Sequence, residues 1–420
     1  MAFVIIFCLF ALLILGVPIA FTLGIVGLIS VLIFGITTTT QIAQSSFANL
    51  DSFVLLAIPF FILAGNVMVH ANLARYLVDF MQALARPITG GLAVGTTLVA
   101  ALFGAMTGSS AASSAALGKI ILPELTKKNH PLSFAAGLIA AGGTLAIMIP
   151  PSLTFVIYGA IAQVSVTDLF LAGIVPGLFT AALLSILAWY MVRRNKWGFH
   201  GKFSIVEVWQ TSIKAIPALL MPLIVLGGIY TGFFTPTEAA AVSALYGILI
   251  GGFVYRTLNF QNLLQIFTDS AKTTAVVLFI IAGAIFIGMI STLAGIPSTI
   301  VRLVEDFNLS RVLYLLIVNV IIIILGCFFD GVTILTVFTP MFLPSAKVLG
   351  IDLIHFAMMI TLNIEIASVT PPVGVNLFVI SGIAKKSIEY VARGVLPFIF
   401  VLLFALAVVT YVPSMSLVFK

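Results

Sequence analysis

The sequence contains very little charge. Asp, Glu, Lys and Arg make up 8% of its 420 residues, whereas soluble domains average about 25%. Hydrophobic residues make up 62%. Apolar runs of about 20 residues, the length that crosses a bilayer core, recur along the chain. The longest polar stretch is residues 193–202, so no separate polar domain is expected. The composition excludes a soluble protein and predicts an all-α integral membrane protein surrounded by lipid.

The sequence also lacks the patterns of most enzymes. Cys8 and Cys327 lie in apolar runs and are expected to be core residues, not a disulfide or a metal pair. The histidines are scattered without metal-ligand spacing. No G-x-x-x-x-G-K-[ST] motif occurs, which argues against ATP hydrolysis. The net charge of +6 fits membrane topology better than a nucleic-acid partner. We therefore expect neither an enzyme nor a nucleic-acid-binding protein.

The chain contains an internal repeat. Three landmarks recur 221 residues apart (371 − 150), and two earlier ones recur 218 residues apart (236 − 18). Because the landmarks recur in the same order and at almost the same separation, they indicate two homologous halves, joined near residues 195–213. The pairs are Leu122-Pro123 with Leu343-Pro344, Pro150-Pro151 with Pro371-Pro372, Gly173 and Pro176 with Gly394 and Pro397, Pro18 with Pro236, and Ala64-Gly65 with Ala282-Gly283.

The second half is predicted to be inverted in the membrane. If residues 108–126 and 330–348 are arms of re-entrant hairpins, each half crosses the membrane an odd number of times. Inverted repeats of this kind are typical of transporters. The positive-inside rule supports this topology. With residues 193–194 in the cytoplasm, 15 of the 19 lysines and arginines lie on the cytoplasmic side, and the other four are Arg302, Arg311, Lys347 and Lys420. Both termini are then expected outside.

Four expected divisions follow from the repeat. Residues 1–86 form the first-half scaffold and arm helices, and residues 87–193 form the first hairpin and a broken transmembrane helix. Residues 194–306 form the connection with the second-half scaffold and arm helices, and residues 307–420 form the second hairpin and broken helix. The amphipathic segments 71–86 and 259–272 are expected to be interfacial helices.

Helix breaks identify a candidate cavity. "FGAMTGSSAASSAALG" (103–118) pairs with "GGTLAIMIPPSLT" (142–154), and "GCFFDGVTILTVFTP" (326–340) pairs with "IEIASVTPPVGVN" (364–376). Broken backbone at membrane depth is tolerated where protein buries it or where it lines a wet cavity. Small residues that allow close helix packing, and simple proline kinks, are the alternatives. The hairpin tips and the double-proline breaks recur together in both halves, which favours a binding site over these alternatives.

Unwound carbonyls and hydroxyl or carboxylate oxygens suit Na⁺, so we expect one ion between each hairpin tip and its paired break. A solute carboxylate is expected between the tips. Asp330 is expected to be a helix N-cap, a cation ligand or a gating contact, and capping can coexist with either of the other two roles. The role of Glu365 stays open. The Na⁺ candidates are Gly108, Ser109, Ser110, Ile149, Pro150, Ser152, Asp330, Gly331, Thr333, Thr370, Pro371 and Gly374; the solute candidates are Ser109, Ser110, Asp330 and Asn376.

Seven motifs together resemble the large (DctM-type) membrane subunit of the TRAP (tripartite ATP-independent periplasmic) transporters. They are "GVPIAF", "IPFFILAGNVM", "GAMTGSSAAS", "MIPPS", "GIVPG", "FTPTEAAA" and "TPPVGVNLFV". The resemblance implies a bacterial inner-membrane importer of an elevator type, driven by Na⁺, for C4-dicarboxylates or sialic acids. It also implies a small four-helix membrane subunit and a periplasmic substrate-binding protein as partners.

Two other functions remain as alternatives. An ion channel or passive pore can be built on an inverted repeat, although no span shows the continuous polar face that a wet path requires. A membrane scaffold without transport leaves the symmetric breaks unexplained. Saturable uptake distinguishes a transporter from a channel.

Overall fold

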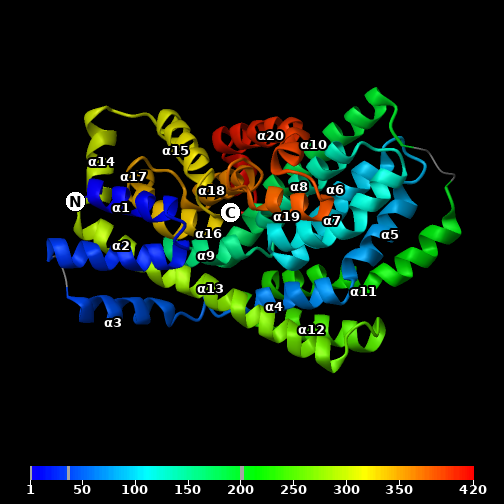
Figure 1. The fold of residues 1–420 in the computed structure, drawn as a ribbon, viewed down its shortest axis with the longest axis horizontal. Coiled ribbons are helices and arrows are strands. Elements are labelled where there is room, and N and C mark those ends of the chain that lie inside the picture. The colour runs from blue at the N-terminus through cyan, green and yellow to red at the C-terminus, as the bar shows by residue number, and fades with distance from the viewer. Residues whose placement is uncertain (1, 36–37, 199–202) are drawn as a thin grey trace.

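The computed structural model describes residues 2–35, 38–198 and 203–420, and the regular elements of these residues are helices (Figure 1). Their bounds are α1 Ala2–Ile14, α2 Ile19–Phe34, α3 Thr39–Leu50, α4 Ala57–His70, α5 Leu73–Ala85, α6 Gly91–Thr107, α7 Ser110–Lys127, α8 Leu132–Met148, α9 Leu153–Ala162, α10 Val166–Asn195, α11 Ile205–Tyr230, α12 Pro236–Leu249, η1 Ile250–Val254, α13 Phe260–Leu293, α14 Ile296–Asp306, α15 Arg311–Gly326, α16 Gly331–Thr333, η2 Ile334–Phe338, α17 Thr339–Val348, α18 Leu353–Ser368, α19 Val375–Ala384, α20 Ile388–Tyr411 and α21 Ser414–Leu417. The elements η1 and η2 are π-helical turns.

The helices form a multi-pass membrane protein. Within the described residues, six are long and apolar enough to cross a bilayer, or up to eight if each bent pair counts as one span. Large apolar side chains on the outer surface are exposed, among them Phe233 and Phe260, which are 83% and 82% exposed. Such surfaces are stable only against lipid or another apolar partner. Several remaining apolar helices are shorter because they are halves of hairpins or of broken spans.

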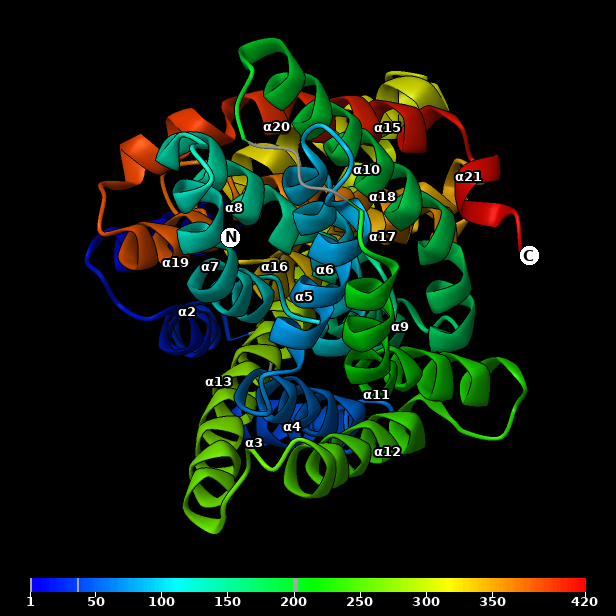
Figure 2. The same cartoon turned by 90° about the vertical axis from the view of Figure 1, so that its right-hand side faces the viewer.

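The two halves interlock around a pseudo-two-fold axis. Helix α2 of the first half packs against α13 of the second, and α12, the counterpart of α2, packs against α4 of the first half. The segments after the two breaks also pack against the opposite half. Helix α19 of the second half packs against α7 of the first hairpin, and α9 of the first half packs against η2 and α17 of the second hairpin. Helices α3, α4, α12 and α13 lie together on one side of the molecule (Figures 1 and 2). The predicted repeat is therefore a spatial symmetry.

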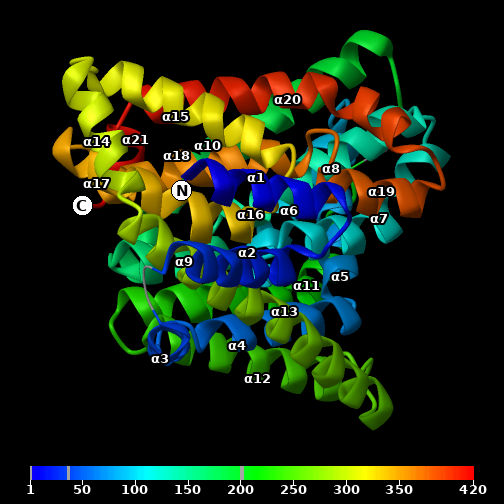
Figure 3. The same cartoon turned by 60° about the vertical axis from the view of Figure 1, so that its left-hand side comes forward.

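Each half contributes a hairpin, and the two hairpins enter from opposite ends (Figures 1 and 3). The first hairpin, α6 and α7, turns at Gly108, whose φ of 57° favours glycine. The second runs through α15 into α16, η2 and α17. Its π turn precedes Pro340, which has no N–H for the regular helical ladder. Both tips reach the middle of the molecule.

The double prolines break two helices at corresponding points. Helix α8 ends at Met148, and α9 starts at Leu153 at an angle of 41° to it. Helix α18 ends at Ser368, and α19 starts at Val375. A proline inside a helix removes a donor and clashes with the preceding turn, so two in succession end the helix. Both Pro-Pro bonds are cis.

One predicted element is wrong. Residues 259–272 were expected to be a separate interfacial helix, but they form the first part of α13, which runs unbroken for 34 residues. No glycine or proline occurs in α13 before Gly283, so nothing ends the helix. In the first half, the amphipathic helix α5 follows the span α4. Its counterpart in the second half is the amphipathic helix α14, which follows α13. Residues 199–202 of the predicted join between the halves lie outside the described residues.

Candidate functional site

A cavity of about 400 Å³ lies between the two hairpin tips. Its walls come from both hairpins, from α9, α18 and α19 beside the breaks, and from α4 and α13. Asp330 is the one ionisable side chain among the described residues that line it. The polar lining residues are Asn66, Thr107, Ser109, Ser110, Thr154, Thr273, Asp330, Ser368 and Asn376. A largely apolar cavity with a few converging polar groups is typical of a small-molecule site.

The first tip is joined to the second half of the chain by hydrogen bonds. Ser110 Oγ donates to Asn376 Oδ1 at 2.7 Å, and Asn376 Nδ2 donates to the Ala140 carbonyl at 2.9 Å. Both side chains are buried. Ser109 caps α7, because its Oγ accepts from the Ala112 N–H at 3.4 Å. The amide of Asn376 therefore fixes the relative positions of the first hairpin, α8 and α19.

The second tip is organised by a carboxylate. Asp330 Oδ2 accepts from the Val332 N–H at 3.2 Å, and Oδ1 accepts from Thr333 Oγ1 at 2.5 Å. Asp330 is thus a helix N-cap, one of the three roles expected of it, while its carboxylate also faces the cavity. Asp330 and Ser109 lie 221 residues apart (330 − 109), so the two halves place an N-cap at the same point.

The first predicted Na⁺ region is a contact between tip and break. A Cβ on Gly108 would lie 3.2 Å from the Pro151 carbonyl oxygen, so the two backbones nearly touch. Ser152 Oγ donates to the Ile147 carbonyl at 2.5 Å, which holds the broken segment against α8. The tip residues Gly108, Ser109 and Ser110 line the cavity, whereas Ile149, Pro150 and Ser152 lie just outside its lining.

The second predicted Na⁺ region is less closely assembled. Gly331 lines the cavity and faces Ile364, in the turn of α18 before the break. Thr370 Oγ1 donates to the Ile366 carbonyl at 2.6 Å, and the Gly374 N–H donates to the Thr370 carbonyl at 3.0 Å. Thr333, Thr370, Pro371 and Gly374 are outside the cavity lining. The contact of Gly331 with Ile364 places this tip against the last turns of α18.

Several lining residues were missed by the sequence analysis. Asn66 on α4 and Thr273 on α13 form the wall opposite the breaks. Asn66 Nδ2 donates to Ser270 Oγ at 2.8 Å and links these two helices. Both residues lie in unbroken helices, so no break indicated them. The one available signal was a lone asparagine inside the apolar run "IPFFILAGNVM".

Glu365, whose role the sequence left open, lies on the symmetry axis and not in the cavity lining. Thr144 Oγ1 lies 3.3 Å from Glu365 Oε2, and the two residues are separated by the repeat offset of 221. Two symmetry-related residues can touch only where the axis passes between them. Glu365 is fully buried, and Oε1 has no hydrogen-bond partner among the described residues.

Two interlocked inverted repeats, paired hairpins and helix breaks around a central polar cavity define a secondary-transporter architecture. Comparison with known proteins identifies the family. The family described as "Tripartite ATP-independent periplasmic transporter, DctM component" matches residues 6–415. The chain belongs to this family of large TRAP permease components, as its motifs suggested. It is therefore one component of a transporter with three parts, and several of its relatives are named as large permease proteins.

Three relatives illustrate the family's range. The C4-dicarboxylate TRAP transporter large permease protein DctM of Pseudomonas aeruginosa is 39% identical, over 94% of this chain and 93% of that protein. The 2,3-diketo-L-gulonate large permease YiaN of Escherichia coli is 36% identical, over 97% and 96%. The sialic acid large permease SiaM of Vibrio cholerae is 34% identical, over 96% and 94%.

One solved structure has a similar fold. The YdaH transporter of Alcanivorax borkumensis aligns with a TM-score of 0.63, over 88% of this chain and 86% of that one, at 15% sequence identity. An identity this low supports the fold alone. The expected class, an all-α membrane protein with the topology of an inverted-repeat transporter, is confirmed.

Proposed function

We propose that the protein imports a small carboxylated solute together with Na⁺, by an elevator mechanism. The observation that carries the proposal is the cavity between the hairpin tips, where hydroxyl and amide groups surround one carboxylate. Relatives named for a dicarboxylate, a keto sugar acid and a sialic acid share one feature, a carboxylate on a polar solute. A dicarboxylate or a sialic acid is the proposed substrate class.

Hard oxygen ligands near each tip support Na⁺ as the coupling ion. At the first tip these would be the Ser109 and Ser110 hydroxyls with carbonyls of residues 149–152. At the second they would be Asp330 with the Thr333 hydroxyl and carbonyls of residues 370–374. The hydroxyls of Ser152, Thr333 and Thr370 each donate to another group, which leaves their lone pairs for a cation. Two or more Na⁺ ions are proposed.

The solute carboxylate would bind near Ser110 and Asn376, beside the positive N-terminal ends of α7 and α16. Asp330 alone would repel it. A Na⁺ ion between the two carboxylates removes this repulsion, because opposite charges at a few ångströms attract strongly at low dielectric. This gives a physical reason why solute binding would require Na⁺.

In the proposed assembly, the hairpins and broken helices move against a scaffold that includes α4, α12 and α13. A small four-helix membrane subunit would cover part of the exposed apolar surface, and a periplasmic binding protein would deliver the solute. The lysine and arginine distribution supports a bacterial inner-membrane location with both termini in the periplasm.

Uptake by proteoliposomes that contain this chain and its partners tests the coupling. We expect saturable uptake that rises with Na⁺ and requires the binding protein. Equal uptake in Na⁺-free vesicles with a K⁺-clamped potential would remove the coupling. Fast, non-saturating flux without the binding protein would favour the passive pore.

Asp330→Asn tests the second Na⁺ region. Asparagine is also a good N-cap, so the variant keeps the cap but removes the charge. Asp352→Asn is the matched control, since Asp352 caps α18 in the same way but lies away from the cavity. We expect the Na⁺ concentration for half-maximal uptake to rise about tenfold in Asp330→Asn only, the loss of one charge-assisted bond. Unchanged Na⁺ dependence would make Asp330 only a cap.

A further inference from the structure

A second cavity lies at the end of the molecule that the charge distribution assigns to the cytoplasm. It measures about 170 Å³ and shares no lining residue with the central cavity. It lies between the α5–α6 corner, the α7–α8 loop and the segment after α10. Arg86, Lys128 and His130 line it, and none of its lining residues is acidic. Three basic side chains around a hollow of this size suit an anion of several atoms.

The start of α6 adds to the positive potential of this cavity. Gly90, Gly91 and Leu92 belong to its lining. The first N–H groups of a helix have no intrahelical partner. In α6 no side chain caps them, and the Gly91 N–H instead donates to the Ile88 carbonyl at 2.8 Å, which leaves the N–H groups of Leu92 and Ala93 for a ligand. The first turn of α6 also contains no acidic residue. The positive end of a 17-residue helix is thus directed at the cavity, as in known phosphate sites.

His130 is the observation that points independently to a ligand. The residue is 5% exposed, and its Nε2 is buried without a hydrogen-bond partner among the described residues. Its Nδ1 lies 3.2 Å from the Leu125 carbonyl. A carbonyl only accepts, so Nδ1 carries a hydrogen. Nε2 is then a free acceptor in the neutral ring and a donor in the protonated ring. Leaving such a group unpaired is costly, so an occupant that bonds to it is expected.

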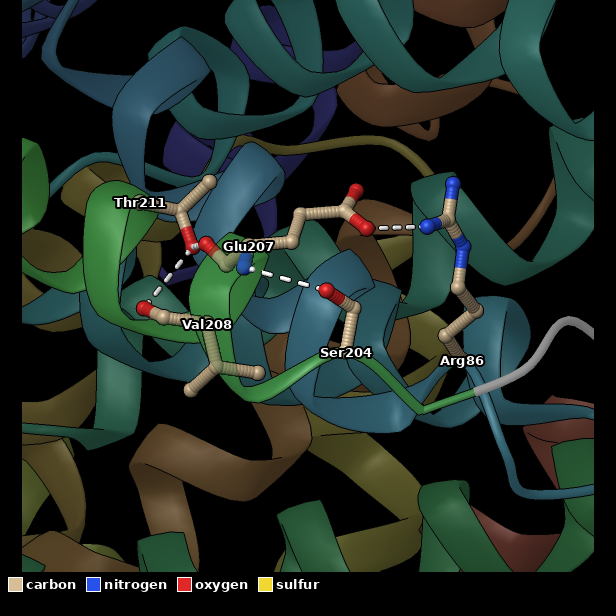
Figure 4. Close-up of polar contacts among 5 residues, drawn as sticks. All are labelled: Arg86, Ser204, Glu207, Val208 and Thr211. Carbon is tan, nitrogen blue, oxygen red and sulfur yellow. Dashed lines mark hydrogen bonds and ion pairs between the residues drawn. The ribbon is translucent and has the colours of Figure 1, made fainter.

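Arg86 is held in place at the edge of the cavity. Its Nη1 bonds to Glu207 Oε2, and the Glu207 N–H donates to Ser204 Oγ at 3.3 Å, so α11 fixes the guanidinium (Figure 4). A guanidinium has five N–H donors, and one bond to a carboxylate leaves others for a ligand. Lys128 is the remaining cation, and no salt bridge within the described residues neutralises it.

We propose that this cavity binds a phosphate group, held by Lys128, Arg86, the N-terminus of α6 and His130. A phosphate offers several acceptor oxygens to these donors. Free phosphate as a monoanion also offers a P–OH that can donate to Nε2 of the neutral ring, which an ionised carboxylate lacks. The phosphodiester group of a lipid headgroup has acceptor oxygens only, so it would accept a hydrogen bond from Nε2–H of the protonated ring. The group would come either from free phosphate or from the headgroup of an anionic phospholipid of the cytoplasmic leaflet. The site is independent of the proposed transport mechanism.

The test measures binding to the full-length chain, purified in detergent with any partner that stays bound. Inorganic phosphate is titrated against thermal stability, with chloride at equal ionic strength as the reference. In a second arm the protein is placed in nanodiscs of phosphatidylcholine with increasing phosphatidylglycerol. Lys128→Gln is compared with Lys127→Gln, which removes the same charge from an exposed neighbour outside the cavity.

We expect a saturable rise in melting temperature in one arm for the wild type and for Lys127→Gln, weakened at least about tenfold in Lys128→Gln. A response to phosphate identifies a free ion, and a response only to phosphatidylglycerol identifies a headgroup. His130→Leu should lose the same response. It removes the unpaired Nε2 but also the bond from Nδ1 to the Leu125 carbonyl, so its response is compared with its own melting temperature in chloride. Equal responses of the two lysine variants, or no saturable response in either arm, would overturn the proposal.

Discussion

The buried pair on the pseudo-two-fold axis leads to a specific prediction about charge. Thr144 has one hydroxyl hydrogen and two neighbours that can accept it, the Ala141 carbonyl at 2.7 Å and Glu365 Oε2 at 3.3 Å. The shorter bond takes the hydrogen. A bond between Thr144 and Glu365 then requires a hydrogen on the carboxyl group. We predict that Glu365 is held as the neutral acid, which donates to Thr144 and links the two broken helices.

Glutamine tests this, because it has the shape of the neutral acid and can donate the same bond. Glu365→Gln is expected to change the free energy of unfolding by less than about 1 kcal/mol. Glu365→Ala removes a fully buried long side chain and should cost about 2–4 kcal/mol, as comparable truncations do. A double-mutant cycle with Thr144→Val should give a coupling of about 0.5–1.5 kcal/mol.

The assay combines unfolding in detergent with uptake by proteoliposomes. If Glu365 were ionised, its burial without a charged partner would cost at least about 2.5 kcal/mol, and Glu365→Gln would be stabilised by a similar amount. That outcome would refute the neutral acid. Loss of Na⁺-driven uptake in a fully stable Glu365→Gln would instead mean that the carboxyl takes part in transport and is more than a link.

Two further predictions concern packing and pH. A Cβ on Gly394 would overlap the Ser133 carbonyl, so Gly394→Ala should destabilise the α8–α20 contact by about 1–3 kcal/mol, as overpacking does; Gly382→Ala, with open space around it, should change stability by no more than about 1 kcal/mol. Burial raises the pKa of Asp352, but the hydrogen bonds from Lys420 and from two backbone N–H groups outweigh burial and lower it. Because folding lowers this pKa, the Asp352 carboxylate stabilises the folded state at pH values above its ordinary pKa of 3.8. This stabilisation is lost as the pH falls through the lowered pKa. Lys420→Met should reduce this acid sensitivity and cost no more than about 1 kcal/mol at neutral pH, since the pair is partly exposed; an unchanged acid midpoint would contradict it.

The sequence was sufficient to predict the symmetry of the fold. A proline interrupts the hydrogen bonds of its own helix regardless of what that helix packs against, so Pro150 and Pro371 predict helix breaks from the sequence alone. The wrong prediction for residues 259–272 also came from a local pattern. Amphipathic spacing describes a helix face but does not say where the helix ends, and α13 contains no residue that would end it.

The site was only partly predictable because one of its walls carries no local signal. Ser109 stands beside Gly108, which turns the chain, and Asp330 is a charged residue inside an apolar run, so both tip residues could be found. Asn66 and Thr273 become neighbours of the tips only when α4 and α13 pack beneath them. Glu365 was found but could not be interpreted, since its contact with Thr144 depends on how the two halves cross.

The symmetry of the backbone does not extend to the charges, and this difference bears on the proposed mechanism. Ser109 and Asp330 occupy equivalent caps, yet only the second half supplies a carboxylate to the cavity. A Na⁺ ion at the second tip would be neutralised by the protein. A Na⁺ ion at the first tip would have hydroxyls and carbonyls only, so its counter-charge has to come from the solute carboxylate. The first-tip ion and the solute would then stabilise each other, and by linkage each would raise the affinity of the other by the same factor.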